Sequence, residues 1–200
     1  MEKRFILILL LGTILAGCGE KKEKREEEKP KTAADALQQF ANKAKDMQTG
    51  EKVNPVDFRK LKEFLPEKIA GFKRTEVSGE KNGAMGFTLS TAEASYNGSN
   101  DASIHLEILD TGGIAGAATM AMAAWTMADI DKESDTSYEK TTQLDGYKAF
   151  EKYDSQSKSG ELNLLVADRY VVNVNGNNVT MEQMKNALAD LNLNRLADLK

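Results

Sequence analysis

Hydrophobic residues follow two different periods along the chain. Between residues 32 and 65 they recur every three or four positions, which is the spacing of a helix with one buried face. From residue 69 onward they mostly alternate with polar residues, as in a strand with one buried face. The pattern therefore predicts helices first and a long series of strands after them.

Two helices are expected before the first strand. Residues 32–35 have the form of a capping box, with Asp35 in the Glu/Gln place, and apolar residues follow at helical spacing as far as Met47. Asn54 as N-cap and Pro55 at the first helical position predict a second helix, and Pro66 ends it.

Seven strands are expected in two groups. The first group covers residues 69–78, 85–96 and 102–110, and the second covers residues 138–144, 148–154, 162–167 and 170–175. Turn-forming residues separate the strands, at 80–83, 97–101, 145–146, 155–160 and 168–169. Short turns between successive strands predict antiparallel pairing.

A third and a fourth helix complete the predicted fold. Residues 114–128 are rich in Ala and Met and apolar on nearly every side, with Trp125 among them, so we expect a helix buried against the sheet and too short to span a membrane. Thr180 caps the last helix, whose buried stripe is Met184, Ala187, Leu188 and Leu191. The order ααβββαββββα predicts an α+β fold, an antiparallel sheet of about seven strands covered by helices.

The first eighteen residues have the form of an export signal. Glu2-Lys3-Arg4 precedes an apolar run at 5–15 that is too short for a bilayer span but has the length of a signal-peptide core. The run ends in Leu15-Ala16-Gly17-Cys18, which resembles the lipobox of bacterial lipoproteins. The resemblance implies cleavage before Cys18, acylation of its thiol and attachment to a membrane. The alternative is an ordinary signal peptide that ends in small residues.

A charged segment separates Cys18 from the predicted helices. Eleven of the thirteen residues at 19–31 are charged and none is apolar, so we expect a hydrated tether; a solvated helix is the alternative. Gly19 follows the cysteine, at the position where the inner-membrane retention signal of enteric lipoproteins has Asp. We therefore expect the protein at the outer membrane, on its periplasmic side or at the cell surface. The predicted organisation is a signal peptide at 1–17, lipidated Cys18 with the tether at 18–31, and one α+β domain at 32–200.

Composition narrows the classes of function. Hydrophobic residues make up 40% of the chain and mean hydropathy is −0.49, which excludes a disordered chain and a polytopic membrane protein. The net charge of −4 predicts no general affinity for nucleic acid. One cysteine allows no intramolecular disulfide, and one histidine, His105, disfavours a His-rich zinc site or a Ser-His-Asp hydrolase.

Two candidate sites lie where the third strand ends. Residues 108–112 resemble the apolar-apolar-Asp-Thr-Gly signature of aspartic proteases, which would make Asp110 catalytic; the alternative is a strand-ending turn. Gly112, Gly113 and Gly116 lie around the junction of a strand with a helix N-terminus and could hold an anion there, although close packing of helix and sheet also requires small residues.

Two further groups could bind a metal. Asp129, Asp131, Glu133 and Asp135 alternate like the first ligands of a calcium loop, but they also fit a solvated acidic linker. Thioether and imidazole groups suit Cu(I), and the candidates are Met120, Met122, Met127 and His105, with Trp125 among them. Packing is the alternative for the methionines. His105 alternates with Ile104 and Leu106, which predicts a half-exposed position on the polar face of its strand.

These observations favour a non-enzymatic lipoprotein. We expect a binding or envelope-assembly module without a cofactor, a bound metal or catalytic residues, attached to the membrane at Cys18, with an envelope protein as its partner. The alternative is an envelope hydrolase or metal-dependent enzyme that uses carboxylates near Asp110 or His105.

Overall fold

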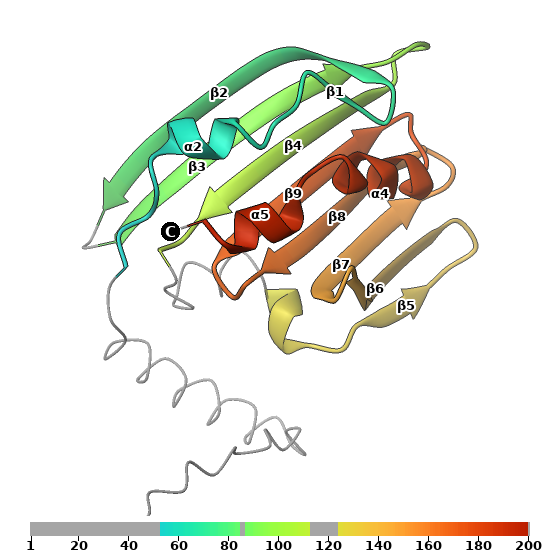
Figure 1. The fold of residues 1–200 in the computed structure, drawn as a ribbon. Helices are drawn as coiled ribbons and strands as arrows, with labels where there is room; N and C mark the ends of the chain where they lie inside the picture. Colours follow the sequence, from blue (N-terminus) through green and yellow to red (C-terminus); the bar gives the residue numbers. More distant parts are fainter. Residues whose placement is uncertain (1–52, 85–86, 113–123, 200) are drawn as a thin grey trace, which may run out of the picture.

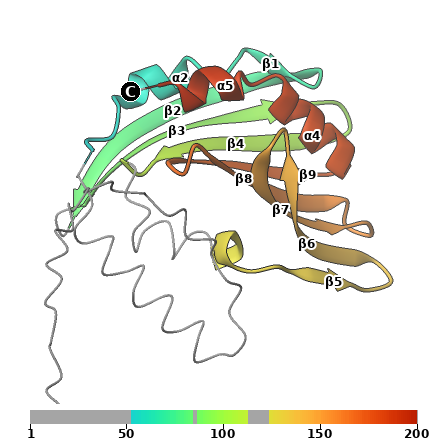
Figure 2. The same ribbon diagram turned by 60° about the horizontal axis from the view of Figure 1, so that its bottom comes forward.

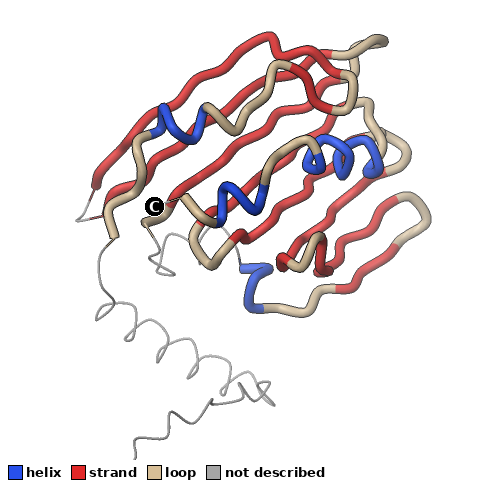
Figure 3. Tube along the Cα trace, in the orientation of Figure 1, coloured by secondary structure: helices blue, strands red, loops and turns tan. Residues whose placement is uncertain are grey.

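The computed structural model describes residues 53–84, 87–112 and 124–199 (Figure 1). Nine strands form one antiparallel sheet, which accounts for most of the described chain (Figure 3). The first meander comprises β1 (Lys68–Ile69), β2 (Phe72–Ala84), β3 (Phe87–Asn97) and β4 (Ser103–Asp110). The second comprises β5 (Asp131–Glu133), β6 (Ser137–Leu144), β7 (Tyr147–Asp154), β8 (Ser159–Val166) and β9 (Tyr170–Asn177).

The two meanders join through their last strands. β4 pairs with β9, so the spatial order is β1-β2-β3-β4-β9-β8-β7-β6-β5. Three helices lie on one face, which we call the helix face: α2 (Phe58–Lys62), α4 (Met181–Ala189) and α5 (Leu193–Ala197). The 3-10 helix η1 (Ala124–Met127) lies on the other side, the η1 face (Figure 2). None of these described helices is long and apolar enough to cross a bilayer.

The main hydrophobic core lies between the sheet and the helix face. Alternate residues of the central strands point into it, among them Ile104, Leu106, Leu164 and Val172, each at most 1% exposed. Each such side chain stabilises the fold by about 1.5 to 3 kcal/mol. Gly176 lets α4 approach the sheet, because a Cβ there would collide with Val179 and Met184.

The predicted α+β fold is wrong. The sheet has nine strands rather than about seven, and the helices that cover it are short, so the described chain is β-rich. The additional strands are β1 and β5. β5 lies in the acidic run that the sequence predicted as a linker, and it forms because Asp131, Lys132 and Glu133 pair with β6. Pairing satisfies backbone hydrogen bonds whatever the local preference of the side chains.

The first hairpin turn also differs from its prediction. Residues 80–83, predicted as a turn, lie inside β2, where Lys81 pairs with Ser90 and Gly83 with Thr88. β1 pairs only with Phe72 and Lys73, so at residues 80–83 β2 is itself the edge of the sheet. At its other end, positive φ angles at Ala70 and Gly71 make a turn that separates β1 from β2.

The structure describes only part of the helices predicted before β1 and between β4 and β5. The predicted helix at 32–49 lies outside the described residues, as does 113–123 of the predicted helix 114–128. Of the latter helix the described part is η1, where Trp125 is 6% exposed. Trp125 does not join the main core; it stacks on Phe150 at 6.3 Å between ring centroids, on the η1 face.

Capping residues decide where the remaining helices begin. Asp57, not Asn54, caps α2 and accepts a hydrogen bond from the backbone N–H of Arg59. The predicted N-cap of the last helix is confirmed: Thr180 caps α4 in a reciprocal capping box with Gln183. Of the predicted buried stripe, Met184, Ala187 and Leu188 lie in α4, whereas Leu191 is buried beyond its end. α4 ends at Ala189, and a separate helix follows it, α5, capped by Asn192 and not predicted.

Candidate functional site

Asp110 lies at the end of β4 on the helix face and is fully buried. Both carboxylate oxygens are occupied. Arg169 donates to them through Nε and Nη2, each at 2.8 Å, and the backbone N–H groups of Val56 and Gly112 donate at the same distance. The carboxylate therefore ties together three segments: the chain before α2, the end of β4 and the β8–β9 turn.

This geometry assigns Asp110 a structural role. A carboxylate that activates water needs a free oxygen facing a substrate, whereas that of Asp110 is saturated. The hydrogen bond to Asp110 raises the pKa of Arg169. Gly112 has φ +72°, and a Cβ there would collide with Val53. Its N–H is committed to Asp110, and Gly113 and Gly116 of the predicted anion site lie outside the described residues.

His105 lies on the η1 face, half-exposed as predicted, with 42% of its side chain exposed. Its Nε2 is 3.5 Å from Glu93, and its Nδ1 is 3.4 Å from the Ser95 hydroxyl. Ser78 donates to the second oxygen of Glu93 at 2.8 Å. Because His105 and Asp110 are five residues apart on one strand, they point to opposite faces. The predicted catalytic carboxylates near Asp110 and His105 therefore do not share one site.

A row of polar side chains crosses the centre of the η1 face. Successive strand pairs align Ser78 of β2, Glu93 of β3, Glu107 of β4, Asn173 of β9 and Asn163 of β8. We call these five residues the polar row. Within it, Asn173 donates to Glu107 at 2.7 Å. Phe150 of β7 continues the row beyond Asn163.

A second aligned set runs beside the polar row. It contains Ser95, His105, Asn175, Glu161 and Lys152. Two contacts join the sets: His105 with Glu93, and Asn163, whose Nδ2 donates to Glu161 at 2.5 Å. The η1 face thus carries carboxylates, carboxamides and hydroxyls over five strands, and the contacts among them form three separate groups.

Two buried polar atoms beside Phe150 have no hydrogen-bond partner. Asn163 is 4% exposed and its Oδ1 is unpaired; Trp125 is 6% exposed and its Nε1 is unpaired. Trp125 stacks on Phe150, which is the cross-strand neighbour of Asn163. An unpaired buried polar group costs about 1 to 3 kcal/mol, and the Ser90 hydroxyl in β3 is a third such group among the described residues.

The residues predicted as metal ligands do not form a metal site among the described residues. Asp131 and Glu133 are exposed in β5, and Lys132 between them pairs with Glu139 at 3.4 Å. Met120 and Met122 lie outside the described residues. In the parts of the chain that the structure describes, no group of three or more His, Cys, Asp or Glu side chains is arranged to hold a metal ion.

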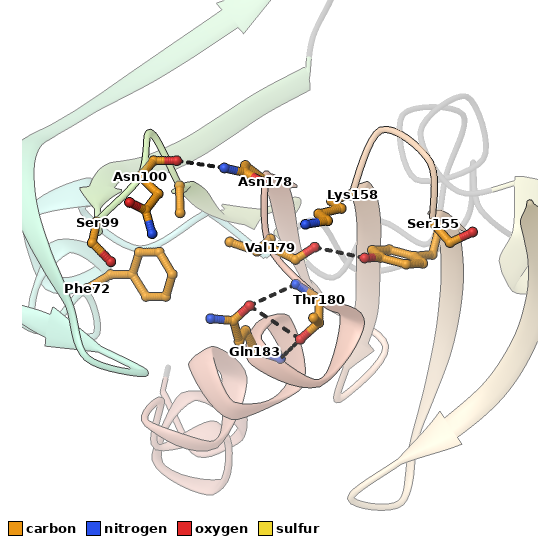
Figure 4. Close-up of a pocket in the computed structure, with 11 residues that line it drawn as sticks. Phe72, Ser99, Asn100, Ser155, Lys158, Asn178, Val179, Thr180 and Gln183 are labelled. Carbon is orange, nitrogen blue, oxygen red and sulfur yellow. Dashed lines mark hydrogen bonds between the residues drawn. The ribbon is translucent and has the colours of Figure 1, made fainter.

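A hollow of about 430 Å³ lies where α4 begins (Figure 4). Phe72, the β3–β4 turn, the β7–β8 turn and the β9–α4 loop line it. Some of its polar groups are paired with one another: Asn178 donates to the carbonyl of Asn100 at 2.6 Å, and Thr180 and Gln183 form the capping box. None of the described residues that line the hollow has a buried polar atom without a hydrogen-bond partner.

Sequence reasoning missed Asn163, Asn173 and Glu107. Each occupies an outward position of an alternating strand, where a polar residue is ordinary. The available signal was Asn163 itself, a carboxamide at the second position of an otherwise apolar run, Leu162 to Val166. The chain matches no family model, and no curated protein or solved structure is detectably similar to it.

Proposed function

We propose that the chain is a bacterial lipoprotein of the outer membrane, attached through acylated Cys18 and a charged tether, whose sheet serves as a binding module through its η1 face. Support for the anchor comes from the lipobox at Leu15-Ala16-Gly17-Cys18 and from its position directly before residues 19–31. Two acyl chains suffice for stable attachment without an apolar span.

The observation that carries the binding role is the polar row on the η1 face, in which Glu107 and Asn173 are half-buried and joined by a hydrogen bond of 2.7 Å. Helices α2, α4 and α5 occupy the other face, so the polar array on the η1 face is not needed for the main core. Binding surfaces combine a few convergent polar groups with an aromatic border, and the polar row beside Trp125 and Phe150 has that composition.

A hydrolase built on His105 is the second candidate, favoured by the contacts of His105 with Ser95 and Glu93. Acyl transfer also needs free N–H groups to stabilise the oxyanion. Ser95 lies inside β3, which pairs with β2 on one side and β4 on the other, so the surrounding backbone N–H groups are engaged in the sheet. Binding therefore fits the geometry better than acyl transfer.

Single thiols on the two faces test the binding role. Asn175→Cys places a thiol on the η1 face, and the matched control Asn186→Cys places one at an exposed position of α4 on the helix face. The one native cysteine is the proposed acylation site, so each variant has one free thiol. If the η1 face is occupied in cells, a maleimide labels Asn175→Cys several-fold more slowly in intact membranes than after purification, whereas Asn186→Cys reacts equally in both. Equal rates for Asn175→Cys would refute the proposal.

A further inference from the structure

The two edges of the sheet differ in how they are protected. β5 forms one edge and consists of exposed, charged residues only, Asp131–Glu133 (Figure 1). β2 forms most of the other edge, because β1 pairs with only Phe72 and Lys73 of this 13-residue strand. A short, charged edge resists pairing with another chain, whereas a long regular edge permits it. The β2 edge is therefore the one that can accept a further strand.

The hydrogen bonds of β2 show which of its backbone groups point outward. The N–H of Arg74 points away from β3, because it donates to the carbonyl of Glu67 at 2.9 Å. Outward-pointing groups recur at every second residue of a strand, and the bulge after Arg74 shifts that alternation by one residue. No described strand pairs with the backbone groups that point outward beyond the bulge. We call the residues that carry them the outward row: Val77, Gly79, Lys81 and Gly83.

Side chains do not block the outward row. Gly79 and Gly83 have none, and glycine inside a strand often marks the close approach of a second backbone. Lys81 carries the charge that could guard the edge, but its Nζ is turned back to the Pro55 carbonyl, to which it donates at 2.7 Å. Val77 packs against the main core. The outward row thus has no proline and no lysine that extends over the edge, which are common protections of an edge strand.

The sequence of β2 is complementary to itself in one register. A two-fold axis perpendicular to the sheet pairs two copies of the strand antiparallel, with the same face of each copy on the same side. When Gly79 faces Gly79 of the second copy, Val77 faces Lys81 and Ser78 faces Glu80. Lysine stems pack on apolar side chains, and serine opposes glutamate without repulsion. No two like charges lie opposite each other in this register.

The neighbouring registers are less favourable. Centring the pair on Ser78 places Glu76 opposite Glu80, and centring it on Glu80 places that residue opposite itself. Like charges directly opposite each other destabilise a pair of strands. Centring the pair on Val77 would bring the second copy into the place of β1. The register centred on Gly79 avoids both obstacles.

We propose that a second copy of this chain binds along β2, antiparallel and in the register centred on Gly79, so that two sheets join into one. Pairing satisfies the outward N–H and C=O groups of both copies. The axis keeps the helix faces of the two copies on one side of the joined sheet and the η1 faces on the other. The contact is therefore separate from the proposed binding surface and does not depend on it.

Disulfide formation between two single-cysteine variants tests the register. In the proposed pair, Ser78 and Glu80 of the second copy are a non-hydrogen-bonded pair, with Cα atoms about 4.5 Å apart, which suits a disulfide. Full-length Ser78→Cys and Glu80→Cys chains are purified in detergent, mixed and oxidised. The mixture should give at least about tenfold more linked dimer than either variant alone, because identical residues lie on a diagonal of the pair, too far apart for the bond.

The unaltered chain, whose only cysteine is Cys18, is the control for this experiment and should give no linked dimer, because that thiol is the proposed acylation site. No linked dimer from the mixture beyond that of the control, or equal yields from the mixture and from the separate variants, overturns the proposal.

A proline at position 81 tests whether the backbone makes the contact. The N–H of Lys81 points outward, so Lys81→Pro removes a hydrogen bond to the second copy and none to β3. Lys81→Ala is the matched control, because it loses the same side chain and keeps the N–H. Sedimentation equilibrium in detergent gives the dimer Kd, which we expect to be about tenfold higher for Lys81→Pro than for Lys81→Ala. Equal Kd values in the two variants would refute backbone pairing at this edge.

Opposite charges at position 77 give a second measurement that does not depend on the folding of a proline variant. Val77→Glu and Val77→Lys lose the same valine packing, but in the dimer they face Lys81 of the second copy with opposite sign. We expect the Kd of Val77→Lys to be several-fold higher than that of Val77→Glu, with a smaller difference in concentrated salt. Equal values or the reverse order would contradict the proposed register.

Discussion

At the scale of single residues, the Asp110–Arg169 pair joins distant parts of the chain. Asp110 is fully buried and the Arg169 side chain is 14% exposed, so neither charge can be compensated by water. Breaking such a pair from one side leaves an uncompensated charge inside the protein. Asp110 also accepts a hydrogen bond from the N–H of Val56, and therefore fixes the segment before α2 to the end of β4.

Asp110→Asn should destabilise the protein by about 3 to 5 kcal/mol, because Arg169 then faces a neutral amide. Urea denaturation followed by Trp125 fluorescence measures the change. Glu63→Gln is the matched control, since it breaks an exposed ion pair with Arg195 at 3.2 Å and should cost less than about 1 kcal/mol. Similar losses in both variants would show that Asp110 is not the structural clamp described above.

Two buried tyrosines predict a loss of stability in alkali. Burial raises the pKa of Tyr96 and of Tyr170 to about 12, and their hydroxyls donate to the carbonyls of Pro66 and Leu199. In the unfolded chain a tyrosine ionises near pH 10. Between about pH 10 and 12 the unfolded state therefore loses protons that the native state keeps, and the free energy of unfolding falls.

The expected slope is about 1.4 kcal/mol per pH unit for each of these tyrosines. Urea denaturation at about pH 9 and about pH 11 measures it. Tyr96→Phe removes one ionising group, so the variant should lose less stability over the same interval than the original chain. The same loss in both chains would rule out Tyr96 as a source of the effect.

At the scale of elements, capping residues determined where a helix begins, whereas turn-forming residues did not determine where a strand ends. The capping residues correctly predicted the start of α4, because the side chains of Thr180 and Gln183 each accept a hydrogen bond from the other's backbone N–H, whatever lies around them. Turn chemistry was not decisive for residues 80–83, because their pairing with β3 outweighs the preference of Asn82 and Gly83 for a turn. Strand pairing depends on residues far away in the chain, so a local pattern cannot show it.

Thr180→Ala should cost about 1 kcal/mol of stability, since it removes the side-chain acceptor for the N–H of Gln183. Thr180→Ser keeps the hydroxyl and is the control, with a change of a few tenths of a kcal/mol. Urea denaturation gives the total, and hydrogen exchange of the Gln183 amide gives the local effect. If Gln183 stays equally protected in Thr180→Ala, the capping box does not hold the start of α4.

At the scale of the whole molecule, alternation in the sequence predicted which strand residues point to each face. It placed His105 opposite Ile104 and Leu106, and the structure agrees. It could not predict that Asn163, Asn173 and Glu107 form one row, because their alignment depends on the pairing of β4 with β9 and of β9 with β8. The candidate site is a product of sheet register, whereas Asp110, the residue with the clearest motif, has a structural role.

At the same scale, the proposed lipid anchor at Cys18 can be tested by removing its thiol. Cys18→Ser removes the only thiol, so the variant should keep its leader and carry no lipid, because acylation of that thiol precedes cleavage in lipoproteins with this motif. Metabolic labelling with a clickable fatty acid and the mass of the purified chain measure both effects. The control is Ser134→Ala, at an exposed position before β6, which should be labelled and cleaved normally. Fatty acid retained on Cys18→Ser, or a native chain cleaved but unlabelled, would show an ordinary signal peptide instead of a lipid anchor.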